Sequence, residues 1–162
     1  MSEERIIKLD RLRYTKNTAS SRLTILAILF NVFFFVSIYK SDVGSYYYNI
    51  LIGASILYNL CFMLAAFLAS EGVKNYKQGH SWLLIVLGMI QAARIFILPM
   101  QAHSATVKIK GAVVGVMGDG QFVRVVIYLA VSAACLLAAA VINLKKSRAL
   151  SAHIASLGEG KA

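Results

Sequence analysis

The chain is 162 residues long, 59% of its residues are hydrophobic, and its mean hydropathy is +0.68. Soluble globular proteins average roughly 45–50% apolar residues, so this composition excludes an ordinary soluble domain and a disordered chain. The formal net charge of +10 would suit a nucleic-acid-binding protein, but the basic residues lie outside the apolar runs. The charge therefore predicts membrane topology and contact with anionic lipid headgroups, with no nucleic acid as a partner.

Four apolar runs predict four transmembrane helices. They cover about residues 23–39, 47–69, 82–99 and 122–143, close to the ~20 residues that a helix needs to cross a bilayer. Connections between them are short apart from the one between the third and fourth runs, so neighbouring helices should be antiparallel. The sequence therefore predicts an all-α integral membrane protein whose transmembrane domain, residues 23–143, is a four-helix bundle.

A basic tail, residues 1–22, precedes the first run. Ile6, Leu9 and Leu12 recur at a spacing of three, which favours a short amphipathic helix on the membrane surface. A solvated basic tail is the alternative. The apolar run that follows is longer than the ~7–15 residues of a signal peptide and no A-x-A-like cleavage site comes after it. We therefore expect the first run to be a membrane span.

Aromatic and turn-forming residues mark the ends of the runs. Three tyrosines at 46–48 and Trp82 resemble the aromatic anchors found at membrane interfaces. Pro99 is expected to end the third helix. In the longer loop that follows, residues 106–110 alternate between polar and apolar side chains like a strand, and Gly-Asp-Gly at 118–120 is a turn signal. We expect a small hairpin or a cap on the bundle there, with a re-entrant segment as the weaker alternative.

The distribution of basic residues predicts the orientation. An even number of spans places both termini on one side of the membrane. That side receives twelve Lys and Arg residues from the tails 1–22 and 144–162 and the loop 70–81, whereas the other side receives three. Because basic residues concentrate on the cytoplasmic side, we expect both termini in the cytoplasm, in a plasma or inner membrane, with anionic headgroups at the cytoplasmic face as a partner.

Each predicted span carries one hydrogen-bonding side chain near the same depth. At about 1.5 Å per residue, four residues lie roughly 12–17 Å from the cytoplasmic ends of their helices: Asn31, Asn59, Gln91 and Ser132. Unpaired carboxamides cost several kcal/mol in hydrocarbon, so these side chains should meet one another or line a cavity. Structural hydrogen bonds between helices are the simpler interpretation, and a ligand site or pore lining is the alternative.

Small residues accompany each of these polar residues, and such residues let transmembrane helices approach closely. The fourth span carries a second stripe of this kind on another face, Ala130, Ala134 and Ala138. This second stripe predicts a helix–helix interface with a further membrane protein or with a second copy of the chain.

Arg94 lies inside the third span, where a charged side chain is costly and suggests a function or a partner. Three interpretations are open. Arg94 pairs with Asp42 or Asp119 on the outer loops; it meets an acidic residue or a lipid headgroup supplied by a partner; or it holds an anionic substrate together with Arg124 and Gln91. The first of these is the one that we favour.

No catalytic signature occurs in the sequence. There is no HExxH or G-x-S-x-G motif, and no Asp or Glu lies inside a predicted span. Cys61 and Cys135 fall in apolar runs, where packing is their expected role. We therefore expect no enzymatic activity, no cofactor and no metal.

The leading hypothesis for function is an accessory or scaffolding subunit that packs against a larger membrane complex, such as a transporter. The alternative is a small homo-oligomeric transporter or channel for an anionic solute. A third and weaker hypothesis is an adaptor that acts at the membrane surface through its basic tail.

Overall fold

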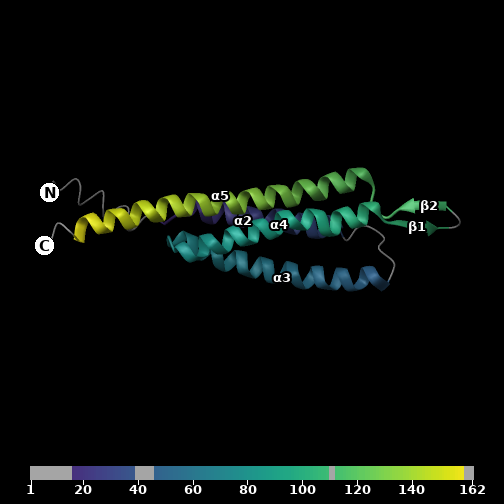
Figure 1. Cartoon of the computed structure of the whole chain (residues 1–162), viewed down its shortest axis with the longest axis horizontal. Coiled ribbons are helices and arrows are strands. Elements are labelled where there is room, and N and C mark those ends of the chain that lie inside the picture. Colours follow the sequence, from purple (N-terminus) through teal and green to yellow (C-terminus); the bar gives the residue numbers. More distant parts are fainter. Residues whose placement is uncertain (1–15, 39–45, 110–111, 159–162) are drawn as a thin grey trace.

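Four long helices make up most of the part of the chain that the structure describes. The computed structural model describes residues 16–38, 46–109 and 112–158. The helices are α2 (Thr18–Ile38), α3 (Tyr46–Lys74), α4 (Gln78–Ser104) and α5 (Asp119–Gly158), and they lie side by side (Figure 1). Each contains a segment that is long and apolar enough to cross a membrane. The prediction of a multi-pass membrane protein built as a helix bundle is confirmed at this level.

The connection between α4 and α5 is a two-stranded antiparallel hairpin, where a small hairpin or a cap was expected. Strand β1 (Thr106–Ile109) pairs with β2 (Ala112–Gly115). The hairpin extends beyond one end of the helices (Figure 1), which we call the hairpin end. The opposite end, where α2 begins and α3 ends, is called the terminal end.

The helices are packed unequally. Both α2 and α4 pack extensively against α5, whereas α3 contacts α2 and, to a lesser extent, α4. Close approach between α4 and α5 is possible because residue 88 is glycine: a Cβ atom there would lie 3.0 Å from the side chain of Leu137. Small residues at helix interfaces are the usual means of tight packing in membranes.

The apolar core has two parts. One cluster lies toward the terminal end and includes Ala27, Phe62 and Leu136. The other lies toward the hairpin end and includes Phe34 and Leu129. Among the described residues, the second cluster has no member from α3. The described buried core residues of α3 all lie in its second half: Phe62, Ala66, Ala69 and Val73.

Two helix ends differ from the expectation. Pro99 lies inside α4, which continues to Ser104, so the prediction that Pro99 ends the helix is wrong. A proline removes one backbone donor, but neighbouring helices in a membrane protein can accommodate the loss, and Pro99 is buried. In addition, α5 continues past Asn143 to Gly158, and Figure 1 shows its last turns extending beyond the ends of α3 and α4. The first part of the predicted C-terminal tail is therefore helical.

Three expectations fall outside the described part of the chain. The predicted interfacial helix lies mostly in residues 1–15, and Asp42 lies in residues 39–45. The side chains of the three tyrosines at 46–48 are not described either, although α3 begins at Tyr46.

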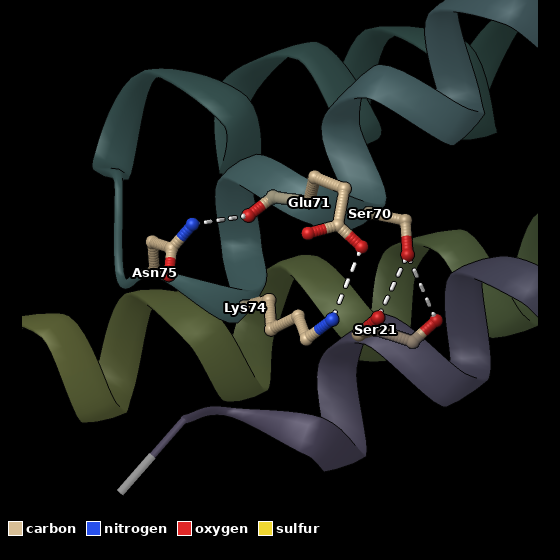
Figure 2. Close-up of polar contacts among 5 residues, drawn as sticks. All are labelled: Ser21, Ser70, Glu71, Lys74 and Asn75. Atoms are coloured by element: carbon tan, nitrogen blue, oxygen red, sulfur yellow. Dashed lines mark hydrogen bonds and ion pairs between the residues drawn. The ribbon is translucent and has the colours of Figure 1, made fainter. Parts of the chain in front are cut away.

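Polar contacts tie α3 to α2 at the terminal end. Ser21 Oγ lies 2.8 Å from Ser70 Oγ (Figure 2), and both side chains are buried. The backbone N–H of Asn17 donates to the carbonyl of Lys74 at 2.9 Å. Nearby, the exposed Lys74 Nζ lies 3.2 Å from Glu71 Oε1. The buried serine pair and the backbone contact fix the start of α2 against the end of α3.

Candidate functional site

Three of the four predicted polar residues contact one another inside the bundle. Gln91 Nε2 on α4 donates to Asn31 Oδ1 on α2 at 2.8 Å and to Ser132 Oγ on α5 at 3.3 Å. Ser132 Oγ donates onward to the backbone carbonyl of Ala27 at 2.9 Å. The side chains of Asn31, Gln91 and Ser132 are fully buried. These contacts link three helices at one depth, between the two apolar clusters.

Arg94 lies in the same layer and connects it to α3. Its Nη1 donates to Asn31 Oδ1 at 3.2 Å, to Asn59 Oδ1 at 3.2 Å and to Gln91 Oε1 at 3.1 Å. Because Nη1 carries two hydrogens, these three acceptors share them. Asn59 makes no direct hydrogen bond to the other members of the predicted layer; its Nδ2 donates to the carbonyl of Ser55 on its own helix at 2.7 Å. Four polar residues and Arg94 form what we call the polar layer: Asn31, Asn59, Gln91, Arg94 and Ser132.

Two aromatic rings enclose the guanidinium of Arg94. Its Cζ lies 4.7 Å from the ring centroid of Phe34 on α2 and 4.3 Å from that of Tyr58 on α3. A planar guanidinium stacks well on ring faces, and the attraction strengthens when water is excluded. Only 7% of Arg94 is exposed. Its charge is therefore held inside the bundle by amide oxygens and ring faces.

The structure does not bring Arg94 and Asp119 together. Asp119 begins α5 at the hairpin end, its side chain is 96% exposed, and its Oδ1 lies 3.8 Å from Nε2 of His103. Arg94 lies nine residues before His103 on α4, which is about 13 Å along the helix axis. The pairing fails because the carboxylate is at the end of the bundle while the guanidinium points into its interior. Asp42, the other expected partner, lies outside the described residues.

Arg124 also lies apart from the polar layer. It is exposed on α5, and its Nε donates to the carbonyl of Gly120 at 3.0 Å. Of the three residues expected to hold an anionic substrate together, the structure places only Arg94 and Gln91 in contact.

Two buried donors beside Arg94 have no hydrogen-bond partner among the described residues: Asn31 Nδ2 and Tyr58 OH. Buried polar atoms are nearly always paired, so such donors call for an explanation. Next to a positive charge, they form a set of groups that an anion would satisfy. Within the described residues, no three His, Cys, Asp or Glu side chains gather in a way that could hold a metal ion.

A second set of buried polar contacts was missed by the sequence reasoning. Asn143 on α5 accepts from Asn17 Nδ2 at 2.9 Å, and its own Nδ2 donates to Ser81 Oγ on α4 at 2.7 Å. All three side chains are fully buried. The sequence feature that could have indicated these contacts is Asn143 itself, a polar residue between Ile142 and Leu144 at the end of an apolar run. It was interpreted as the end of a span and not as a contact within the bundle.

The second alanine stripe lies on the outside of α5. Ala130, Ala134 and Ala138 are all exposed, whereas Ala133 and Ala139 are buried against the other helices. The residues of the predicted helix–helix interface are thus exposed on the outside of the bundle.

Comparisons with known proteins add no relative. No protein-family model matches the chain, and neither the curated proteins nor the solved structures contain a significant match.

Proposed function

We propose that the protein is an accessory or scaffolding subunit that packs against a larger membrane complex, such as a transporter, through the outer face of α5. The observation that carries the proposal is the exposed stripe of Ala130, Ala134 and Ala138. A small residue at every fourth position lets a second transmembrane helix approach closely. Large apolar residues, Ile127 and Val141, are exposed on either side of the stripe and would add contact area.

The inner face of the same helix supports this interpretation. There Ser132, Ala133 and Ala139 are buried, and α5 packs closely on α2 and α4. Helix α5 therefore has small residues on two faces, and one of them is used inside the bundle. The outer stripe offers the same kind of surface to another chain.

The chemistry of the bundle interior favours a structural role over ion-coupled transport. Among the described residues, the carboxylates are Glu71 and Asp119, and both are exposed near helix ends. Proton-coupled transporters commonly rely on Asp, Glu or His side chains inside the membrane. Hydrogen bonds within the polar layer instead join the four helices to one another.

The proposed orientation places both termini in the cytoplasm, as the distribution of basic residues predicts. The final part of α5 would then leave the membrane on the cytoplasmic side, where Lys145, Lys146 and Arg148 are exposed. At that surface they would attract anionic headgroups, each contributing about 1 kcal/mol.

Site-specific crosslinking tests the interface. In a variant that carries Cys61→Ser and Cys135→Ala, one cysteine is introduced at Ala134, or at Leu64 on α3 as a control; Leu64 is 62% exposed. In native membranes, we expect a crosslinked polypeptide with Ala134→Cys and not with Leu64→Cys. Two differently tagged copies of the chain show whether that polypeptide is a second copy. The proposal would be contradicted if both cysteines gave the same yield of crosslinked product, or if neither gave any.

A small transporter or channel for an anionic solute is the second candidate. The buried donors Asn31 Nδ2 and Tyr58 OH beside Arg94 favour it. In proteoliposomes that contain the purified protein, Tyr58→Phe removes one donor and keeps the ring. Tyr128→Phe removes a hydroxyl outside the polar layer and is the matched control. This candidate predicts chloride or nitrate flux that falls several-fold in Tyr58→Phe alone, and flux equal to that of empty liposomes would exclude it.

A further inference from the structure

A groove of about 430 Å³ lies between α2 and α5 in the half of the bundle nearer the hairpin. Its volume is within the roughly 300–1,000 Å³ that is usual for ligand sites. The groove has an apolar wall and a polar end. Val32, Phe33 and Val36 of α2 with Tyr128 of α5 form the wall, and Gln121 and Arg124 of α5 form the polar end.

The order of these residues along α5 matches the order of chemical layers in a bilayer. Arg124 lies five residues after Asp119, about 7 Å from the start of the helix, and Tyr128 lies about 13 Å from it. Headgroup regions add about 5–8 Å on each side of the hydrocarbon core, and an arginine can extend its charged end toward them. With the bilayer boundary at residue 122, where the predicted fourth span begins, the polar end of the groove lies at headgroup depth and the apolar wall lies at the depth of the acyl chains.

One side of the groove is open, and a hydrogen bond between α2 and α5 lies at its polar end. Phe33 is 45% exposed and Val36 is 52% exposed, so the wall faces the lipid. At the polar end, Gln121 Nε2 donates to the backbone carbonyl of Ser37 at 2.7 Å. This hydrogen bond joins α2 to α5 at the polar end of the groove.

Arg124 is placed to bind an anion at the polar end. Its Nε donates to the carbonyl of Gly120 at 3.0 Å, which orients the guanidinium. The two terminal nitrogens have no hydrogen-bond partner among the described residues, and they carry four of the five N–H donors of the side chain. The nearest acidic residue along α5, Asp119, lies against His103 instead. Paired N–H groups of this kind fit the oxygens of a phosphate.

We propose that the groove binds one phospholipid with an anionic headgroup. Arg124 binds the phosphate, and an acyl chain lies along Phe33, Val36 and Tyr128. This site is at the hairpin end, so it differs from any contact between headgroups and the basic residues of the two tails. It does not depend on the proposed role as an accessory subunit.

Photocrosslinking of the full-length protein in nanodiscs tests the site. The probes are phosphatidylglycerol and phosphatidylcholine that carry the same photoreactive acyl chain, and the measurement is the yield of lipid adducts on residues 32–37 and on Tyr128. We expect phosphatidylglycerol to label these positions more than phosphatidylcholine. Arg124→Gln should reduce this preference about fivefold, which corresponds to about 1 kcal/mol.

Two further variants distinguish lipid binding in the groove from a general electrostatic attraction of anionic lipid to the protein. Arg148→Gln removes an exposed charge on the same helix at the other end, and the adducts in the groove should not change. Val36→Trp fills the exposed wall and should lower the adduct yield for both lipids. The proposal is overturned if Arg124→Gln leaves the preference intact or if Arg148→Gln reduces it equally. It is also overturned if a photoreactive residue at position 36 captures a polypeptide and not lipid.

Discussion

Arg94 Nη1 lies 3.2 Å from Asn59 Oδ1, and this hydrogen bond is how α3 joins the polar layer. The other helices of the layer, α2, α4 and α5, are linked by Gln91 without it. Because the apolar cluster toward the hairpin end has no described member from α3, the contacts of Arg94 with Asn59 and Tyr58 hold the middle of that helix in place. The buried charge of Arg94 thus takes part in contacts between the helices.

A double-mutant cycle between Arg94 and Asn59 should show coupling. Arg94→Leu leaves Asn59 Oδ1 and Gln91 Oε1 without the donor that they share, at a cost of about 1–3 kcal/mol for each group left unpaired; Asn31 Oδ1 still accepts from Gln91 Nε2. Asn59→Leu removes one of these acceptors. We expect the double variant to be more stable than the sum of the single effects predicts, with an interaction of about 0.5–3 kcal/mol. The free energy of unfolding in detergent micelles measures it, and strictly additive effects would contradict the contact.

Arg94→Lys should not rescue the layer. Lysine keeps the charge, but an ammonium group lacks the planar face with which the guanidinium stacks between the rings of Phe34 and Tyr58. We expect a loss of about 1–3 kcal/mol in the free energy of unfolding, comparable with other lost hydrogen bonds to charged groups. Chemical denaturation of both proteins in the same detergent gives the difference. A lysine variant as stable as the wild type would show that only the charge matters.

Depth along a helix was predictable from the sequence, but side-chain direction was not. A rise of 1.5 Å per residue places Asn31, Gln91 and Ser132 near one another, and short side chains leave them few other partners. Arginine is different because its long side chain can point outward to the headgroups or inward to the core. For Arg94, the amide oxygens and the rings of Phe34 and Tyr58 around it decide the direction. Their positions depend on how the helices are rotated.

The ends of the third and fourth predicted helices differ from the structure for a similar reason. Pro99 was interpreted as a helix end because proline interrupts helices, and Asn143 as the end of a span because basic residues follow it at 145, 146 and 148. In the structure, Pro99 is buried inside α4, and Asn143 is buried in contact with Asn17, just before α2, and with Ser81 of α4. Tertiary packing satisfies these groups, and a local pattern contains no information about partners that are distant in the sequence.

Gly88 should be sensitive to substitution, whereas Gly53 should not. A Cβ atom at Gly88 already lies 3.0 Å from the side chain of Leu137, but a Cβ atom at Gly53 meets nothing within 4 Å. Gly88→Leu should therefore push α4 away from α5 and cost about 1–3 kcal/mol, as overpacking does. Gly53→Leu should leave stability unchanged or raise it slightly, because leucine favours a helix more than glycine. Thermal unfolding of the two variants provides the comparison.

Asn143 should matter more for stability than the exposed Asn75. Asn143→Leu leaves the buried donors of Asn17 and the hydroxyl of Ser81 without one partner, which should cost about 2 kcal/mol or more. Asn75 Nδ2 donates to the carbonyl of Glu71 at 3.1 Å in an exposed position (Figure 2), so Asn75→Ala should stay within about 0.5 kcal/mol of the wild type. Equal losses measured by chemical denaturation would mean that the contacts of Asn143 contribute little.

The orientation can be tested by labelling single cysteines from one side of the membrane. In the variant with Cys61→Ser and Cys135→Ala, a cysteine replaces Ala152 near the end of α5 or Asp119 at its start, both of which are exposed. With both termini in the cytoplasm, a membrane-impermeant maleimide applied to intact cells should label Asp119→Cys alone. Permeabilised cells should show labelling at both positions, which verifies that each thiol can react. Labelling of Ala152→Cys in intact cells would reverse the proposed orientation and place the basic end of α5 outside the cytoplasm.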